Sequence, residues 1–231
     1  MIEINDLSKI YEGDDYRVAA LDSISLKIEE GEYVAVMGPS GSGKTTLLNI
    51  IGCMDSPTEG DYFLNEKNVS EMSGRELTNI RKEYVSFVFQ NFALMPDYTA
   101  YENIEVPLLA RNVHRKERKD RIIKIMQRLG IENLINKLPS QMSGGQQQRV
   151  AIARALVADN LLILADEPTG ALDQNTSKDL MDLFDKIHKD GHTVIIITHD
   201  LEVAKRADKI IEIVDGKITK IKNKSTQEFQ G

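Results

Sequence analysis

The sequence predicts an α/β fold with a mostly parallel core sheet, a small antiparallel β layer and an inserted helical subdomain. Three nearly all-apolar segments have the composition of strands buried on both faces of a parallel sheet, namely 85–89, 161–165 and 194–197. Shorter segments near the start alternate apolar and polar residues, as half-buried antiparallel strands do. The stretch 115–128 instead places Ile122, Ile125 and Met126 at helical spacing.

The strands of the β layer and of the core can be placed along the chain. The β layer is expected from three short segments, 2–4, 24–28 and 62–64. Residues 33–37 predict a buried core strand, and 46–51 predict the helix that follows it. Near the end, two apolar segments at 210–214 and 217–221 are separated by two residues, which predicts a hairpin.

The change in character along the chain predicts one domain with an insertion. We expect residues 1–90 and 159–222 to form the core with its β layer. Residues 91–158 are expected to form the helical subdomain, and the polar residues 223–231 a frayed tail.

Composition limits the class of protein. The 231 residues are enough for one large domain, and 41% of them are hydrophobic. A net charge of −7 argues against nonspecific nucleic-acid binding, which usually needs a positive excess. Cys53 is the single cysteine, so no internal disulfide can form. We see no leader sequence and no apolar run of ~20 residues, so we expect a cytoplasmic protein.

A glycine-rich segment lies between the predicted strand at 33–37 and the predicted helix at 46–51. It has the pattern G-x-x-x-x-G-K-T and consists of Gly38, Pro39, Ser40, Gly41, Ser42, Gly43, Lys44 and Thr45. This spacing lets successive backbone N–H groups surround the phosphates of a nucleotide. We expect Lys44 to reach the β- and γ-phosphates and the Thr45 hydroxyl to bind Mg²⁺. A plain glycine-rich turn is the alternative, and the flanking strand and helix favour the phosphate loop.

Polar side chains follow the other core strands at the points where these strands end. They are Gln90, Asp166, Glu167 and His199. Ligands of open α/β sheets bind beyond the carboxyl ends of the strands. We therefore expect these four residues and the phosphate loop to form one site.

Each of these residue types suits a role in phosphoryl transfer, which requires placement of water and neutralisation of charge. Asp166 can hold Mg²⁺, and Gln90 can bind Mg²⁺ or the water. Glu167 is our candidate for the group that orients and polarises the attacking water. His199 can contact the γ-phosphate or orient Glu167. Taken singly, the Asp-Glu pair could instead be a helix N-cap, and a lone histidine is usually structural.

A second glycine-rich cluster begins another predicted helix and consists of Ser143, Gly144, Gly145 and Gln146. A capping box, in which Ser143 and Gln146 bond each other's backbone N–H, accounts for those two residues. It does not account for the two glycines, because glycine weakens a helix. In a first turn, the glycines expose backbone N–H groups to an approaching anion.

The predicted helix at 115–128 carries a basic cluster that consists of Arg115, Lys116, Arg118, Lys119 and Arg121. Nucleic-acid binding is one interpretation, and a solvated helix face is the other. Glu117 and Asp120 interrupt the cluster and favour the solvated face. We therefore predict no nucleic-acid partner.

With both glycine-rich clusters present, the chain resembles the ATP-binding subunit of an ATP-binding cassette (ABC) transporter over essentially its full length. The matching motifs are the phosphate loop, the Q-loop at Gln90, the signature sequence at 143–146, the Walker B carboxylates at Asp166 and Glu167, the D-loop at 171–173 and the switch histidine at His199. Tyr11 falls where the family places an aromatic that stacks on adenine. Met142 stands where the signature usually begins with Leu, which is a mild change for a packing residue.

The resemblance implies ATP and Mg²⁺ as cofactors and a head-to-tail homodimer as the active form. Nucleotide-binding residues outside the phosphate loop are then Tyr11, Thr46, Ser143, Gly144, Gly145, Gln146 and Asp173. The signature of one subunit would complete the γ-phosphate site of the other, with Asp173 at the interface. ATP hydrolysis would power a separate integral membrane permease, and this permease would hold the chain at the inner face of the cell membrane.

Three segments refine the resemblance to one branch of the family. Residues 51–60, 102–108 and 146–149 look like those of MacB-type exporters, lipoprotein-release complexes and peptide-resistance transporters. The permease is therefore expected to be FtsX- or MacB-like. An ATPase that drives a membrane switch, such as the cell-division cassette partnered with FtsX, is the first alternative. A soluble cassette acting on DNA or ribosomes is the second, although the long coiled coils or paired cassettes of such relatives are not present.

Overall fold

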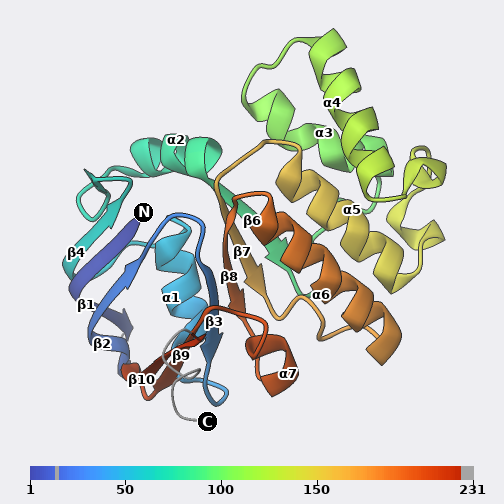
Figure 1. Cartoon of the computed structure of the whole chain (residues 1–231). Helices are drawn as coiled ribbons and strands as arrows, with labels where there is room; N and C mark the ends of the chain where they lie inside the picture. Colours follow the sequence, from blue (N-terminus) through green and yellow to red (C-terminus); the bar gives the residue numbers. More distant parts are fainter. Residues whose placement is uncertain (14–15, 225–231) are drawn as a thin grey trace.

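The computed structural model describes residues 1–13 and 16–224, which form two β-sheets with helices between and around them (Figure 1). The smaller sheet is antiparallel and has the strand order β2-β1-β4-β5. Its strands are β1 (Ile2–Gly13), β2 (Tyr16–Ile28), β4 (Glu59–Leu64) and β5 (Lys67–Asn68). The larger sheet has the order β10-β9-β3-β8-β7-β6. Its strands are β3 (Tyr33–Met37), β6 (Val85–Phe89), β7 (Leu162–Asp166), β8 (Thr193–Ile197), β9 (Lys209–Val214) and β10 (Lys217–Asn223).

The larger sheet is parallel except at one edge. β3 pairs in parallel with β8 and β9, and β7 pairs in parallel with β6 and β8. Only β10 is antiparallel to its neighbour β9. Val194, Ile195 and Ile196 of β8 are fully buried, as the apolar composition predicts. The predicted fold class is confirmed, and the parallel strands bring their carboxyl ends to one edge.

Helix α1 (Lys44–Ile51) lies between the two sheets (Figure 1). Four of its apolar side chains are buried, namely Leu47, Leu48, Ile50 and Ile51. They share a hydrophobic core with Ile4 of β1 and Leu21 of β2. Burying an aliphatic side chain contributes about 1.5–3 kcal/mol, so these contacts fix α1 firmly. The loop that leads into its first residue is fixed with it.

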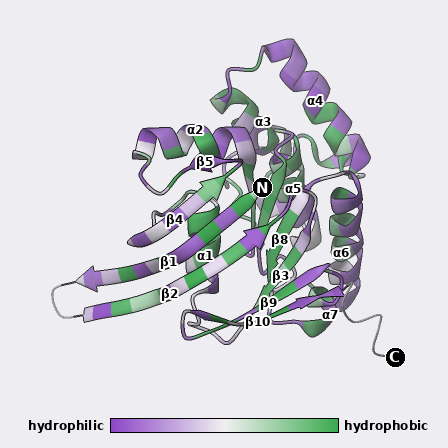
Figure 2. Ribbon diagram, turned by 60° about the vertical axis from the view of Figure 1, so that its left-hand side comes forward, coloured by the Kyte–Doolittle hydropathy of each residue, from purple (hydrophilic) through white to green (hydrophobic). Residues whose placement is uncertain are grey.

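Helices α5 (Gly144–Leu156) and α6 (Gln174–Lys189) contribute to the core on the other face of the large sheet. α6 buries a stripe at helical spacing that consists of Leu180, Met181, Phe184 and Ile187. Figure 2 shows β3 and β8 in the hydrophobic colour and much of α4 and α6 in the hydrophilic one. The short helix α7 (Leu201–Ala204) follows β8.

Helices α3 (Ala100–Ala110) and α4 (Arg115–Arg128) pack with α5 on one side of the molecule (Figure 1). Two short 3₁₀ turns, Glu132–Leu134 and Pro139–Gln141, lead from α4 to α5. α4 has the predicted bounds and buries Ile122, Ile125 and Met126. Its Arg121 forms an ion pair with Glu117 at 2.6 Å on the same helix, as expected for a solvated face. The division of the chain at residues 91 and 158 stays a prediction.

Two elements differ from the expectation. β1 and β2 pair along their whole length, from Ile2 with Ile28 to Gly13 with Tyr16, which is far longer than the predicted segments 2–4 and 24–28. The sequence does not indicate the outer half of this hairpin, because that half is largely exposed and lacks the alternating pattern. Helix α2 (Gly74–Tyr84) was not predicted, because it buries only two residues and leaves almost no apolar stripe in the sequence.

The end of the described chain differs from the expected tail at its first residue. Asn223 pairs with Lys209 as the last residue of β10, so the prediction of fraying is wrong there. The predicted tail otherwise falls mainly on 225–231, which lie outside the described residues. Every helix in the described part of the chain is too short or too polar to span a bilayer.

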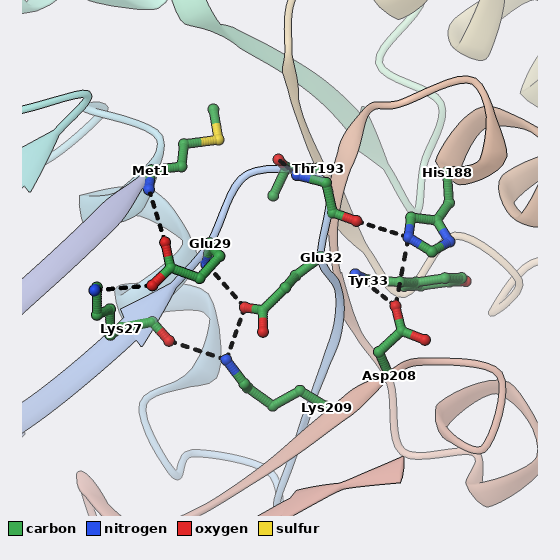
Figure 3. A network of polar contacts seen from close by, with 10 residues as sticks. Met1, Lys27, Glu29, Glu32, Tyr33, His188, Thr193, Asp208 and Lys209 are labelled. Atoms are coloured by element: carbon green, nitrogen blue, oxygen red, sulfur yellow. Dashed lines mark hydrogen bonds and ion pairs between the residues drawn. The ribbon is translucent and has the colours of Figure 1, made fainter. Parts of the chain in front are cut away.

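A polar network holds the amino ends of the parallel strands (Figure 3). Lys209 Nζ donates to Glu32 Oε2 at 2.7 Å and to the Lys27 carbonyl at 3.1 Å. Nearby, His188 Nε2 donates to the Gly31 carbonyl at 2.8 Å, and its ring packs against Tyr33. This edge is therefore tied together by its own side chains, and the candidate site lies at the opposite edge.

Candidate functional site

The phosphate loop leaves the carboxyl end of β3 and enters α1 at Lys44. At two of its glycines, Gly38 and Gly43, another backbone segment lies too close for any side chain to fit. A Cβ on Gly43, whose φ is +100°, would lie 2.3 Å from the Ala20 carbonyl oxygen, and one on Gly38 would lie 2.0 Å from that of Ile213. Both neighbours are backbone and cannot move aside cheaply. The predicted loop therefore has the tight path that its glycines indicate.

Lys44 is 9% exposed and folds back along this loop. Its Nζ donates to the carbonyl oxygens of Gly38 at 2.9 Å and Pro39 at 2.7 Å. The hydroxyl of Ser42 is buried and, among the described residues, has no hydrogen-bond partner. An ammonium group and an unpaired hydroxyl in one cradle suit an anionic ligand with several oxygens.

A cavity of about 410 Å³ opens beside the loop. Its lining includes Gly41, Ser42, Gly43, Lys44, Thr45 and Thr46, together with Ala20, Asp215 and Gly216. The hairpin turn at Asp215 thus closes one side of the cradle, and β2 closes another. The structure brings the predicted phosphate-binding residues together, while Pro39 and Ser40 lie exposed on the outside of the loop.

The residues expected to hold a metal ion partly converge. Thr45 Oγ1 donates to Asp166 Oδ2 at 3.4 Å, which joins the start of α1 to the end of β7. Burial and the adjacent Glu167 carboxylate raise the pKa of Asp166, and the Thr45 hydrogen bond opposes this rise. A hydroxyl and a carboxylate beside a phosphate cradle are the oxygen donors that Mg²⁺ takes when it also binds phosphates. The site therefore fits Mg²⁺.

Glu167 follows Asp166 and adopts a left-handed backbone conformation with φ +43°. Its N–H donates to the Ile197 carbonyl at 3.0 Å, so the turn is tied to the end of β8. Its carboxylate Oε1 lies 3.1 Å from His199 Nδ1. A carboxylate can only accept, so this contact places a proton on Nδ1. The structure thus brings His199 to Glu167, the contact expected if His199 orients that carboxylate. The role of Glu167 toward the attacking water stays a prediction.

Gln90 follows β6, beside the end of β7, because Phe89 pairs with Asp166. Its side-chain amide packs against Gly170, where a Cβ would lie 2.7 Å from Nε2. The described structure gives Gln90 no hydrogen bond to Thr45 or Asp166. Gln90 therefore contacts the segment after Glu167, and its role toward metal or water stays a prediction.

The signature cluster lies against another part of the same chain. The predicted capping box is present, since Ser143 Oγ accepts from the Gln146 N–H at 3.3 Å and Gln146 Oε1 accepts from the Ser143 N–H at 3.0 Å. A Cβ on Gly145 would lie 2.6 Å from Thr176 Cγ2, so this glycine permits close packing on α6. Among the described residues, no hydrogen bond joins the cluster to the phosphate loop of its own chain.

Asp173 is the N-cap of α6 and is fully engaged within its own chain. Its Oδ1 accepts from the N–H groups of Asn175 and Thr176, and its Oδ2 accepts from the Thr176 hydroxyl at 2.6 Å. These bonds lower the pKa of the Asp173 carboxyl. A capping role is shown by this geometry, and the interface role stays a prediction.

Tyr11 projects from β1 as a partly exposed ring, and its role in stacking on the base stays a prediction. Its hydroxyl donates to Asp55 Oδ2 at 2.8 Å, and Lys9 Nζ donates to Asp55 Oδ1 at 2.7 Å. Val18 is paired with Tyr11 across the hairpin and also lines the cavity beside the phosphate loop. Sequence reasoning missed Asp55 and Val18. A prediction of the full β1–β2 hairpin would have paired Val18 with Tyr11 and so placed it near the site. No local sequence pattern indicates that Asp55 contacts Tyr11.

Comparison with known proteins agrees with this geometry. The profile of the ABC transporter family matches residues 21–170. The chain is 48% identical over 218 residues to the macrolide export ATP-binding/permease protein MacB of Hyphomonas neptunium, which covers 94% of this chain and 34% of that protein. It is 46% identical over 218 residues to the uncharacterized ABC transporter ATP-binding protein YvrO of Bacillus subtilis, with 94% and 95% covered. The chain thus spans about a third of the length of its MacB relatives.

Solved structures show the same similarity in three dimensions. The ATP-binding cassette MJ0796, in a dimeric post-hydrolysis state bound to ADP and Pi, has a TM-score of 0.90 and 42% identity, covering 96% of this chain and 98% of that one. A second dimeric structure of this bacterial cassette has a TM-score of 0.89 and 43% identity. The family profile covers well over half of the sequence, and the YvrO and MJ0796 cassettes match along nearly their whole length. The chain belongs to the ABC transporter family and is one of its ATP-hydrolysing cassettes.

Proposed function

We propose that this cassette dimerises head to tail on binding ATP and powers a separate membrane permease, as part of an exporter. The observation that carries the catalytic part is the 3.1 Å contact between His199 and Glu167 at the same sheet edge as the phosphate loop. The Glu167 side chain is 25% exposed, whereas the His199 side chain is 72% exposed and open to a ligand. The pair can therefore hold a water on the Glu167 side and contact a terminal phosphate through the His199 ring.

The residues take distinct roles in this proposal. The loop N–H groups and Lys44 bind the β- and γ-phosphates, and Tyr11 stacks on the base. Thr45 and Asp166 hold Mg²⁺, which neutralises charge on the phosphates when bound. Glu167 orients and polarises the attacking water, and His199 fixes the Glu167 carboxylate. The placement of these groups supplies most of the catalysis, since phosphoryl transfer needs little covalent chemistry from the protein.

A second copy of the chain completes the site in this proposal. The first turn of α5 presents the backbone of Gly144 and Gly145, while its own chain offers no hydrogen bond between that turn and the phosphate loop. A nucleotide bound to the phosphate loop of the partner would supply the anion that the N-terminus of such a helix favours. The similar MJ0796 cassette is described as dimeric with ADP and Pi bound, which supports this arrangement.

Mixing two inactive variants tests the shared site. Lys44→Ala removes the phosphate-binding ammonium, and Ser143→Asp keeps a helix cap while placing a negative charge against the partner's phosphate. A heterodimer of these variants contains one site in which both contributing halves are intact. We expect the mixture to regain roughly one quarter of the active sites of the unmodified protein if subunits pair at random.

The matched control mixes Lys44→Ala with Glu167→Gln, because both changes then lie in the same half of each site. That mixture should stay inactive. Phosphate release is the measurement for both mixtures. If the first mixture also stays inactive, although each variant folds and dimerises, then the head-to-tail arrangement is wrong.

The permease is proposed to dock in a groove between the core and the helical insert. The groove measures about 430 Å³, and its apolar lining includes Met54, Phe87, Phe89, Val106 and Pro107. Phe87 and Phe89 stack with their rings parallel and 5.4 Å apart. The groove begins next to Gln90, so a segment bound there would adjoin the Q-loop. The MacB relatives are named ATP-binding/permease proteins, which supports a permease partner. We propose that this permease is MacB- or FtsX-like and holds the cassette at the inner face of the membrane.

Copurification tests the partner. Tagged Glu167→Gln would be added to detergent-solubilised membranes with ATP and Mg²⁺, and captured proteins would be identified by mass spectrometry. We expect one integral membrane protein, retained less when Phe87→Glu places a charge in the groove. Recovery of soluble or nucleic-acid partners alone would leave the ATPase chemistry intact and overturn the transport proposal. A membrane partner that supports no export after reconstitution would favour the membrane switch.

A further inference from the structure

Gln148 is a fully buried polar side chain to which the proposed mechanism assigns no role. It lies on α5, two residues after the signature cluster, and its exposed fraction is 0%. Its amide Nε2 donates to the Pro168 carbonyl at 2.9 Å. Its amide Oε1 is buried and, among the described residues, has no hydrogen-bond partner.

The acceptor of this bond belongs to the turn that carries Glu167. Pro168 is itself buried and immediately follows Glu167. The turn is further held by the Glu167 N–H to Ile197 and by the Gly170 N–H to the Glu167 carbonyl, both at 3.0 Å. Within residues 1–13 and 16–224, no other group donates a hydrogen bond to the Pro168 carbonyl. Among the described residues, Gln148 is thus the single hydrogen-bond donor to the Pro168 carbonyl.

The turn needs such support, because Glu167 holds an unfavourable backbone conformation. Its φ of +43° lies in the left-handed region, which costs energy for a residue with a side chain. A residue in this conformation persists only where its surroundings fix it on both sides. The Ile197 carbonyl fixes the Glu167 N–H, the Gly170 N–H fixes the Glu167 carbonyl, and Gln148 fixes the carbonyl of the next residue, Pro168.

We propose that Gln148 is a positioning residue that keeps the Glu167 carboxylate in its contact with His199. The bond runs from the signature helix to the catalytic turn, so it also ties the placement of α5 to the placement of Glu167. This inference rests on the role proposed above for Glu167. Gln148 acts only through the backbone and touches no reacting atom.

The unpaired Oε1 separates this role from a purely structural one. A buried polar atom without a partner destabilises a fold. Methionine has a similar length and no such atom, so Gln148→Met loses the bond to Pro168 but also removes the unpaired oxygen. A glutamine kept only for packing would be replaced by methionine with no effect on turnover, whereas a positioning glutamine would not.

The test compares Gln148→Met with Gln147→Met in steady-state ATP hydrolysis. Gln147 lies on the same helix, is partly exposed, and donates to the Met142 carbonyl at 3.3 Å instead of to the catalytic turn. We expect kcat of Gln148→Met to fall about tenfold, since small displacements of a catalytic group are costly, with KM for ATP changed less than about twofold. The melting temperature should stay close to that of the unmodified protein. Gln147→Met should keep its kcat.

A second variant keeps the test decisive if Gln148→Met folds poorly. In Gln148→Glu the introduced carboxyl can donate to the Pro168 carbonyl only while it is protonated, and burial favours that form. Its kcat, divided by that of the unmodified protein at each pH, should rise as pH falls. A ratio that stays below one and does not change with pH, or an unchanged kcat in Gln148→Met, overturns the inference. Failure of the Glu167 role itself is seen separately, as normal hydrolysis by Glu167→Gln.

Discussion

Replacement of Glu167 by glutamine is expected to lower kcat for ATP hydrolysis by about 100-fold or more, the range typical for loss of a positioned general base. The amide has nearly the same shape as the carboxylate, which lies 3.1 Å from His199 Nδ1 in the unmodified protein. The amide oxygen can still accept a hydrogen bond from His199 Nδ1. It cannot polarise water as a carboxylate does. The geometry should therefore survive while the chemistry is lost. Phosphate release under saturating ATP and Mg²⁺ is the measurement.

The same variant should accumulate as a closed dimer, because ATP that is bound but not hydrolysed keeps the shared sites filled. Light scattering should then give about twice the 26.0 kDa of the single chain when ATP is present, and less after ATP is removed. Glu202→Gln is the matched control, since Glu202 lines a cavity of about 580 Å³ together with Glu167 and His199 but pairs with Lys205 on the surface. That control should hydrolyse ATP within about twofold of the unmodified rate. Normal turnover by Glu167→Gln would remove Glu167 from the proposed mechanism.

Most of the site could be predicted because its groups are placed by local sequence. The phosphate loop is continuous, and its glycine spacing determines its path between β3 and α1. Gln90, Asp166 and His199 each lie directly at or after the end of a parallel strand, and parallel strands share one edge. Four buried strands in the sequence are therefore sufficient to predict that these groups lie at the same edge of the sheet.

The parts that could not be predicted depend on contacts between distant segments. Asp55 reaches Tyr11 across 44 positions of the chain, and Gln148 reaches Pro168 across 20. Neither pair has a pattern of its own, because a buried hydrogen bond leaves no periodicity in the sequence. Helix α2 was missed for a related reason. It lies on the surface with a capping box at Ser73 and few buried residues, so its helical signal is the cap alone.

Replacement of Lys44 by alanine is expected to weaken ATP binding by about 100-fold, since hydrogen bonds from a charged donor are worth about 1.5–3 kcal/mol each. In the structure, the Lys44 ammonium is bound to the Gly38 and Pro39 carbonyls within the cradle. Bound phosphates would replace these neutral acceptors by charged ones, which is a gain that alanine cannot provide. Equilibrium titration with a fluorescent ATP analogue measures the loss.

Lys209→Ala is the control, because Lys209 resembles Lys44 in burial and bonding but lies at the other edge of the same sheet. Lys209 is 13% exposed and donates to the Glu32 carboxylate and the Lys27 carbonyl (Figure 3). Its loss should lower the free energy of unfolding by about 1 kcal/mol and leave ATP affinity unchanged. Equal weakening of ATP binding in both variants would show a general effect of losing a buried lysine. Unchanged binding in Lys44→Ala would refute the phosphate-loop role, because no other ammonium group lines this cavity among the described residues.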